Sequence, residues 1–173
     1  MVKPISQPVD QPRATADRFR SLMAGFPTGV CVVTTMGAQG RPWGMTCSSL
    51  CSVSLDPPTL LVCLRDGSPT LDALVRRETF TVNLLHHSAR RTAELFASGA
   101  QDRFARVRWS EPADSGGPHL PDDSHVIADC RVSRAELIND HVVVFGEVLR
   151  VAVVSMRRPL LYGLRRYAEW PDD

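Results

Sequence analysis

The chain has 173 residues, of which 43% are hydrophobic and 23% are charged, and its formal net charge is +1. This length suits one domain with a real core, and the near-neutral charge argues against nucleic acid or an anionic membrane as partner. No stretch has the apolar length of a signal peptide or a membrane span, so a cytoplasmic protein without a membrane partner is expected.

The N-terminal half predicts a tail, a helix and three strand regions. Residues 1–14 are rich in Pro and Gln and predict a disordered tail, which leaves 15–173 as the folded domain. An apolar stripe at helical spacing then predicts a helix, formed by Phe19, Leu22, Met23 and Phe26. Pro27 and Gly29 end this helix, and strand-like runs follow at 30–35, 43–53 and 59–64.

The C-terminal half predicts two helices and three more strands. Ser68 and Ser88 are expected to act as N-caps of short helices, the second of which ends at Gly99. A strand is expected at 79–85, and the composition of 110–124 predicts a loop. Two long strands meet at Asn139-Asp140, a spacing that indicates a hairpin.

These elements favour a mostly β fold with short helices. No glycine-rich turn of the GxGxxG type is present, which argues against a dinucleotide-binding domain of the doubly wound class. Strands at hairpin spacing instead predict a closed or nearly closed antiparallel β-barrel, because closure removes exposed strand edges.

The cysteines and histidines give no metal-binding pattern. CxxC, HxxH and HExxH are all absent, and Cys47 and Cys51 would lie about 13 Å apart on a strand, so no metal site is expected. All five cysteines lie in apolar, strand-like contexts and are expected to be buried small hydrophobes in a reducing compartment; they are Cys31, Cys47, Cys51, Cys63 and Cys130.

The stretch 44–58, GMTCSSLCSVSLDPP, carries an unusual density of hydroxyl groups. Hydroxyls and backbone N–H groups at a strand-to-loop junction can form a concavity that binds an anion. The alternative is a barrel strand whose solvent face is rich in Ser and Thr. Because neither a GxSxG motif nor a P-loop is present, the chemistry is expected to come from a bound cofactor.

Several segments together resemble the flavin reductase-like family, whose fold is the FMN-binding split barrel with antiparallel Greek-key strands. They are FPTGVCVVTT, GMTCSSLCSVSLDPPTLLVCL, SPTLDAL, TFTVNLL, NDHVVVFGEV and PLLYGLRRY, in the family's order and spacing over residues 19–167. Members of this family are reductase components of two-component flavin-dependent monooxygenases. The sequence looks closest to actinomycete members that serve antibiotic biosynthesis.

The resemblance implies a set of flavin-binding residues. The segment Met45–Leu50 would wrap the flavin, and Ser68 and Pro69 would add a phosphate contact at a helix N-terminus. The implied set is Pro27, Thr28, Gly29, Val30, Met45, Thr46, Cys47, Ser48, Ser49, Leu50, Ser68, Pro69, Val82, Asn83 and Phe104.

The resemblance also implies a nicotinamide site. The family has a Gly-Asp-His turn beside this cofactor, whereas this chain has Asn139 in place of the glycine and keeps the histidine as His141. Asn tolerates the left-handed turn conformation, so the geometry is expected to survive. Tyr162 and Arg165 match a C-terminal segment that reaches the dinucleotide site in relatives.

The implied activity is the NADH-dependent reduction of free FAD, or of FMN, for a separate flavin-dependent monooxygenase. No side chain is needed as acid or base, although His141 is a candidate for an assisting role. The resemblance also implies a homodimer. The alternatives are a flavin-binding electron carrier, an FMN oxidase of the pyridoxamine-phosphate class, and an interaction domain that binds no flavin.

Overall fold

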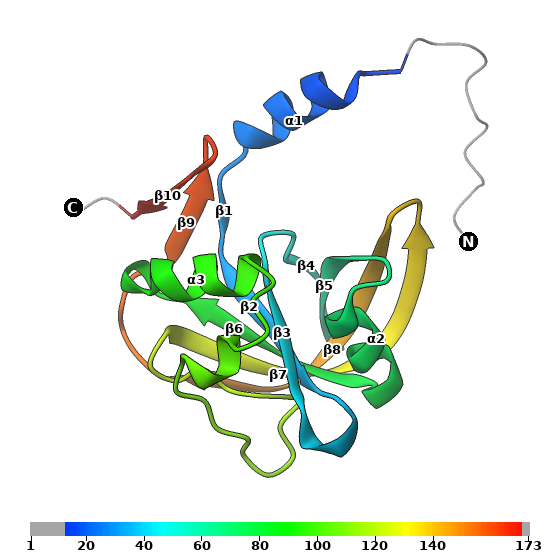
Figure 1. Ribbon diagram of the computed structural model, residues 1–173. Helices are drawn as coiled ribbons and strands as arrows, with labels where there is room; N and C mark the ends of the chain where they lie inside the picture. Colours follow the sequence, from blue (N-terminus) through cyan, green and yellow to red (C-terminus); the bar gives the residue numbers. More distant parts are fainter. Residues whose placement is uncertain (1–12, 171–173) are drawn as a thin grey trace.

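The computed structural model describes residues 13–170 and has two antiparallel sheets (Figure 1). The large sheet has the strand order β3-β2-β6-β7-β8-β5-β4, and the small sheet has the order β1-β9-β10. The strands are β1 (Thr28–Gly29), β2 (Cys31–Met36), β3 (Pro42–Cys47), β4 (Cys51–Leu55), β5 (Pro58–Arg65), β6 (Thr79–Leu85), β7 (Ser124–Ile138), β8 (His141–Val153), β9 (Leu160–Gly163) and β10 (Arg166–Glu169). The helices are α1 (Ala16–Ala24), α2 (Pro69–Arg77) and α3 (Arg90–Ala97), with short 3-10 turns at Ala38–Gly40, His87–Ala89 and Arg103–Ala105.

The large sheet closes on itself between its two edges. Strands β3 and β4 lie at opposite edges, yet only residues 48–50 separate them in the chain. Within this connection the Ser49 hydroxyl accepts a hydrogen bond from the Cys63 N–H (3.0 Å) and donates one to the Cys63 carbonyl (3.1 Å), which ties the connection to β5. The antiparallel barrel expected from the sequence is confirmed. The single strand region expected at 43–53 is wrong, because the chain leaves one edge and joins the other.

The core lies inside the barrel, and α2 covers it. Leu71 and Leu74 of α2 are buried against strand residues such as Val62, Phe80 and Val82. On the outside of β2 and β6, α3 covers a second apolar cluster that includes Phe96 and Leu120. Each face of these central strands is therefore covered by apolar side chains, as their continuous hydrophobic runs require.

The segment 110–124 is irregular, as expected, but its middle is buried. The carboxylate of Asp129 lies beneath it, with only 4% of its side chain exposed. Its Oδ1 accepts hydrogen bonds from the Gly116 N–H, the His119 Nε2 and the Thr81 hydroxyl, at 3.0, 2.8 and 2.8 Å. Gly116 is required here, because a Cβ would lie 2.1 Å from the Phe80 carbonyl oxygen.

Several local predictions are tested by the structure. The β7–β8 hairpin at Asn139-Asp140 is confirmed, and Asn139 has a φ of 56°. Ser88 is not the N-cap of α3: it lies inside a 3-10 turn, and the cap residue is Ala89, which has no capping side chain. Cys51 is exposed, contrary to expectation, since it starts the edge strand β4.

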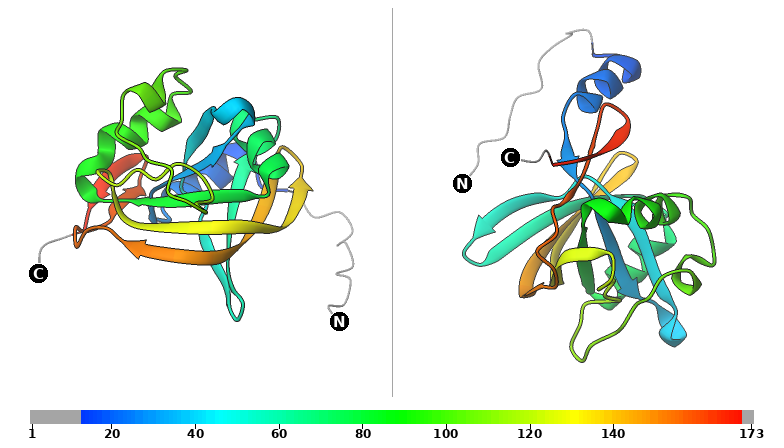
Figure 2. Two further views of the ribbon diagram at one scale, coloured as in Figure 1. Left: turned by 90° about the horizontal axis from the view of Figure 1, so that it is seen from below. Right: turned by 90° about the vertical axis from the view of Figure 1, so that its left-hand side faces the viewer.

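Helix α1 projects away from the barrel beside the small sheet (Figures 1 and 2). We call α1 together with β1, β9 and β10 the arm. No residue of α1 is buried, and its only direct backbone tie to the sheet is the hydrogen bond from the Leu164 N–H to the Ala24 carbonyl (2.7 Å) among the described residues. Nearly all of the predicted tail at 1–14 lies outside those residues. None of the helices at 13–170 is long and apolar enough to cross a membrane.

Candidate functional site

A cavity of about 510 Å³ lies where the arm meets the β3–β4 connection; we call it the arm cavity. Five of the residues implied by the sequence line it, namely Thr28, Ser48, Ser49, Tyr162 and Arg165. They come from β1, the β3–β4 connection, β9 and the β9–β10 turn, which are far apart in the chain. The structure thus brings together residues that the sequence could relate only by resemblance.

The small sheet positions the aromatic wall and the cation of this cavity. Thr28 pairs with Tyr162 in the β1–β9 register, and the Tyr162 ring packs edge-on against Tyr167 at a centroid distance of 5.2 Å. Leu164 and Arg165 form the β9–β10 turn with φ values of 50° and 58°. A two-residue turn with positive φ at both positions normally selects Asn or Gly, so Leu-Arg here stores strain. Strain of this kind is typical of functional sites.

The hydroxyls of the 44–58 stretch do not all face the cavity. The Thr46 hydroxyl donates to the Ala93 carbonyl of α3 at 2.6 Å, and Ser49 is engaged by β5 as described above. The Ser48 hydroxyl has no hydrogen-bond partner within the described part of the chain and lines the cavity. We call the β3–β4 connection, residues 48–50, the seam. The hydroxyl density thus has two causes: Thr46 and Ser49 secure the chain at the seam, and the Ser48 hydroxyl stays free for a ligand.

A pair of thiols lies next to Ser49, whose hydroxyl is 3.1 Å from the Cys47 Sγ. Cys31 and Cys47 are partners in the β2–β3 register, and the Cys31 Sγ donates to the Cys47 carbonyl at 3.3 Å. Hydrogen bonds, first from the Cys31 thiol and then from the Ser49 hydroxyl, lower the pKa of the Cys47 thiol to about 6 against the opposing effect of burial. The pKa of Cys31 is raised in turn. Both side chains are buried, so they form the floor of the seam and do not line the cavity.

A second, smaller cavity of about 260 Å³ lies close by and is mainly apolar. Gly29, Val30 and Leu50, all implied by the resemblance, line it together with His125. Burial, and after it the nearby His86, lower the pKa of His125, which favours the neutral form of its ring. Pro27 lines a third hollow, formed by the arm itself.

Besides Thr46 and Cys47, four more of the implied flavin-binding residues are not brought to these cavities. Val82 is fully buried in the barrel, Met45 packs against the same core, and Phe104 packs between Phe96 and Trp109. The Asn83 amide is also fully buried; its Nδ2 donates to Val32, Thr34 and Pro118, and its Oδ1 accepts from the Leu120 N–H. These contacts use the whole amide, so in this structure Asn83 secures the fold.

The implied nicotinamide and phosphate residues lie farther along β5. His141 pairs with Arg65, two residues or about 7 Å along the strand from the Cys63 backbone that holds Ser49. Its Nδ1 lies 3.0 Å from the Asp140 carboxylate, whose pKa this hydrogen bond lowers. The Ser68 hydroxyl accepts from the Leu71 N–H as the N-cap of α2. These groups lie outside the arm cavity.

Some residues of the arm cavity were not anticipated as site residues. Met23 and Phe26 were expected only as the apolar stripe of a helix, and Arg20 gave no signal in the sequence. Their place in the cavity follows from the arm's position, which pattern reading does not reveal. No cluster of three or more metal-ligating side chains occurs within residues 13–170.

The arrangement fits a flat aromatic ligand with an anionic tail. Apolar and aromatic walls accept a ring, Ser48 offers a hydroxyl, and Arg165 supplies positive charge at the rim. The Arg20 guanidinium is already paired with the Asp17 carboxylate at 2.9 Å. Arg165 has no ion-pair partner in the described part of the chain. The volume lies in the range of small-molecule sites. Flavin meets this description, and Tyr162, Ser48 and Arg165 are the residues that would hold it.

Comparisons with known proteins point to the same ligand. The flavin reductase like domain family matches residues 23–171. A flavin reductase (NADPH) of Lentzea aerocolonigenes is 51% identical over 166 residues, which cover 95% of this chain and 96% of the relative.

Two solved structures are similar to the fold. The NADH:FAD oxidoreductase SgcE6 of Streptomyces globisporus, in complex with NAD and FAD fragments, has a TM-score of 0.84 at 31% identity, covering 91% of this chain and 93% of that one. BorF, the flavin reductase component of a bacterial two-component tryptophan halogenase, has a TM-score of 0.82 at 29% identity, covering 92% and 100%. The chain therefore belongs to the flavin reductase-like family of split-barrel proteins.

Proposed function

We propose that the protein is an NAD(P)H:flavin oxidoreductase that reduces free FAD or FMN and passes the reduced flavin to a separate monooxygenase. The observation that carries this proposal is the arm cavity, which gathers Ser48, Tyr162 and Arg165 around one hollow. NADH is our first choice of reductant. The Lentzea relative is described as NADPH-dependent and SgcE6 as NADH-dependent, so both nucleotides belong in the assay.

The residues of the chain act by positioning. When bound, flavin supplies a ring that accepts hydride from a reduced nicotinamide. Tyr162 and the apolar side chains of α1 hold a ring and exclude water from one face, and Arg165 holds an anionic group at the rim. Correct placement of two rings lowers a barrier by about 7–11 kcal/mol in favourable cases, without any acid or base from the protein.

An open site suits a flavin that must leave after reduction. The walls of the arm cavity come from a projecting helix with no buried residue and from a short three-stranded sheet. Such lightly packed elements move more readily than a barrel core does. Release of reduced flavin to a partner enzyme is therefore compatible with the architecture, and BorF is a component of such a two-component system.

We further propose a homodimer, located in the cytoplasm, that serves secondary metabolism. Exposed apolar side chains on α1 support the dimer, since Phe19 is 57% and Leu22 is 67% exposed in the single chain. The five free cysteines support a reducing compartment. Leu22→Asp is expected to turn dimers into monomers in sedimentation experiments, and an unchanged mass would contradict the role of α1.

The activity is tested with purified protein, NADH or NADPH, and FAD or FMN. Flavin-dependent loss of the nicotinamide absorbance is expected, and its absence with every combination would overturn the proposal.

The flavin site is tested separately by equilibrium dialysis. Arg165→Gln removes the rim cation and is expected to weaken flavin binding roughly tenfold, as the loss of one charge-assisted hydrogen bond does. Arg166→Gln is the matched control, because this neighbouring arginine does not line the arm cavity. Equal flavin affinity in the two variants would show that flavin does not bind in the arm cavity beside Arg165.

A further inference from the structure

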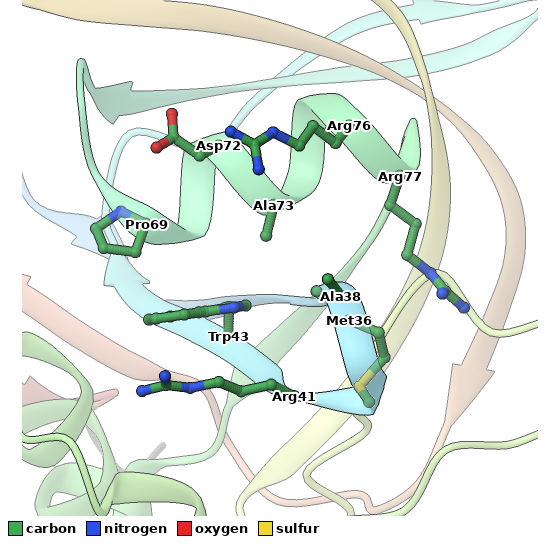
Figure 3. Close-up of a pocket in the computed structure, with 10 residues that line it drawn as sticks. Met36, Ala38, Arg41, Trp43, Pro69, Asp72, Ala73, Arg76 and Arg77 are labelled. Carbon is green, nitrogen blue, oxygen red and sulfur yellow. The ribbon is translucent and has the colours of Figure 1, made fainter.

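A cavity of about 560 Å³ lies on another side of the barrel, between α2 and the turn that joins β2 to β3 (Figure 3). We call it the α2 pocket. Its walls include Trp43, Arg41, Pro69, Ala73, Arg76 and Arg77. It shares no lining residue with the arm cavity, so the two are separate sites.

One wall of the α2 pocket is a flat aromatic surface with one open face. The Arg41 guanidinium lies over the Trp43 ring at 4.3 Å from its centroid and covers one side of the indole. Figure 3 shows α2, with Pro69 and Ala73, on the opposite side of the ring. Gly37 lets the indole lie close to the turn, because a Cβ there would be 2.6 Å from the Trp43 Nε1. Indole, proline and a small alanine form a slot for a planar ring.

The pocket also carries excess positive charge. Arg41, Arg76 and Arg77 line it, with Asp72 as the only acid among its described lining residues. Arg77 is paired with Glu111 outside the lining (3.5 Å), so Arg41 and Arg76 supply the excess charge. Arg76 has no ion-pair partner within residues 13–170, and Arg41 donates its hydrogen bond to a neutral acceptor, the Gln101 amide oxygen (3.0 Å). Burial, and the positive charge of Arg41, lower the pKa of Arg103, so a further guanidinium lies nearby. The guanidinium groups of Arg41 and Arg76, which no carboxylate pairs with among the described residues, favour an anion.

A ring slot beside an arginine cluster is suited to a nucleotide. A phosphate alone would not need the indole face, and an uncharged ring would not need the arginines. The Asp72 carboxylate can accept hydrogen bonds from ribose hydroxyls. Adenosine phosphate supplies all three groups: a planar base, a diol and a strong anion.

The position of the pocket relates it to the flavin site. Trp43 and Ser48 lie near the two ends of β3, about 16 Å apart at the rise of an extended strand. Pro69, in the pocket wall, follows the Ser68 cap of α2 on the side of His141 and β5. A mononucleotide held at Ser48 cannot reach Trp43, whereas a dinucleotide can.

From this geometry we infer that the α2 pocket binds the adenosine phosphate end of a dinucleotide substrate whose reactive ring lies at the β3–β4 seam. The inference rests on the proposed function. Two substrates share this chemistry, FAD and NAD(P)H. The residues that select a dinucleotide over a mononucleotide are Trp43 and Arg76.

The test measures binding by calorimetry with AMP as the first probe. AMP is expected to bind the wild-type protein, and Arg76→Gln is expected to weaken it roughly tenfold. Trp43→Phe, which keeps a ring, should weaken it less than Trp43→Leu. Arg108→Gln is the matched control, because that side chain is 77% exposed and pairs with Asp122 outside the pocket. No AMP binding, or equal binding by Arg76→Gln and wild type, would overturn the inference.

Paired ligands then identify the source of the adenosine. If FAD lies here, Arg76→Gln lowers the affinity for FAD and leaves that for FMN unchanged. If NAD(P)H lies here, the same variant lowers the affinity for NADPH or NADH and leaves that for reduced nicotinamide mononucleotide unchanged. A variant that weakens neither dinucleotide overturns the inference.

This result is separable from the proposed function. Flavin-dependent oxidation of NADH by wild type, using FMN, tests the reductase activity without the adenosine end of the flavin. Activity with FMN but no AMP binding would reject the α2 pocket alone. Loss of all flavin binding and activity would reject the proposed function.

Discussion

Helices α1 and α2 are matched in length and pattern but differ in burial. Each has nine residues, and each begins after a hydroxyl N-cap, Thr15 or Ser68, that accepts from a backbone N–H three residues on. Helix α2 buries four residues over the barrel interior, whereas α1 buries none. Amphipathic spacing therefore predicts that a helix has an apolar face, but it does not predict what that face contacts.

The difference separates stability from ligand contact. The apolar face of α2 is part of the barrel core, so it stabilises the fold. The apolar face of α1 contributes Met23 and Phe26 to the arm cavity and leaves Phe19 and Leu22 exposed in the single chain. We therefore expect substitutions on the apolar face of α2 to lower the stability of the fold, and substitutions on that of α1 to leave the stability nearly unchanged.

The largest effect is expected at Leu74 of α2. This side chain is fully buried in the barrel cluster, so Leu74→Ala should lower the free energy of unfolding by about 2–5 kcal/mol. Leu22→Ala, at an exposed position of α1, is the matched control and should change the monomer's stability little. Urea denaturation at a concentration that keeps both variants monomeric measures the difference. Equal losses of unfolding free energy in the two variants would contradict the proposed difference between the helices.

A smaller loss is expected when the buried amide of Asn83 is removed. Asn83→Ala leaves the Leu120 N–H and the Pro118 carbonyl without this partner, which should cost about 1–3 kcal/mol of stability. Ser52→Ala, at an exposed position of β4, is the control.

Flavin affinity distinguishes the two roles of Asn83. If the amide only secures the fold, the folded Asn83→Ala variant keeps its flavin affinity. If the variant lost flavin affinity without losing stability, the result would support the direct contact between Asn83 and flavin that the resemblance implies.

The smallest effect is a pH dependence centred on Asp129. Burial of the carboxyl raises its pKa, but hydrogen bonds, first from His119, outweigh burial and leave the pKa lowered. A lowered pKa stabilises the fold at pH values above the unfolded pKa of about 4, and this contribution is lost as the pH falls below it. The unfolding free energy should therefore drop on acidification in wild type.

The control for this pH dependence is Asp129→Asn, which cannot titrate. Its unfolding free energy should be lower at neutral pH and should fall less on acidification. Parallel pH curves for the two proteins would show that Asp129 does not anchor the 110–124 segment. The arm has no comparable buried carboxyl among its described residues, so flavin-site variants should leave this pH response unchanged.

Site residues that belong to a local sequence pattern could be predicted from the sequence, whereas roles set by contacts with residues distant in the chain could not. Ser48 and Ser49 were identified from the hydroxyl-rich stretch and the resemblance. The sequence did not show that the Ser49 hydroxyl is hydrogen-bonded to the Cys63 backbone. Arg20 was missed because a single arginine on a helix has no pattern. Asn83 matched the family segment, yet its amide faces the interior through partners more than thirty residues away.

The sequence by itself determined the strand and helix types, the β7–β8 hairpin and the family, because these depend on local periodicity, turn chemistry and ordered segments. Only the tertiary structure decided that β3 and β4 lie on opposite edges of a closed sheet, and that α1 stands in an arm. Pairing between distant strands decides both, and it leaves some hydroxyls bonded within the seam and others facing a cavity. The physical reason is that a side chain's role depends on which groups its neighbours in space have already satisfied.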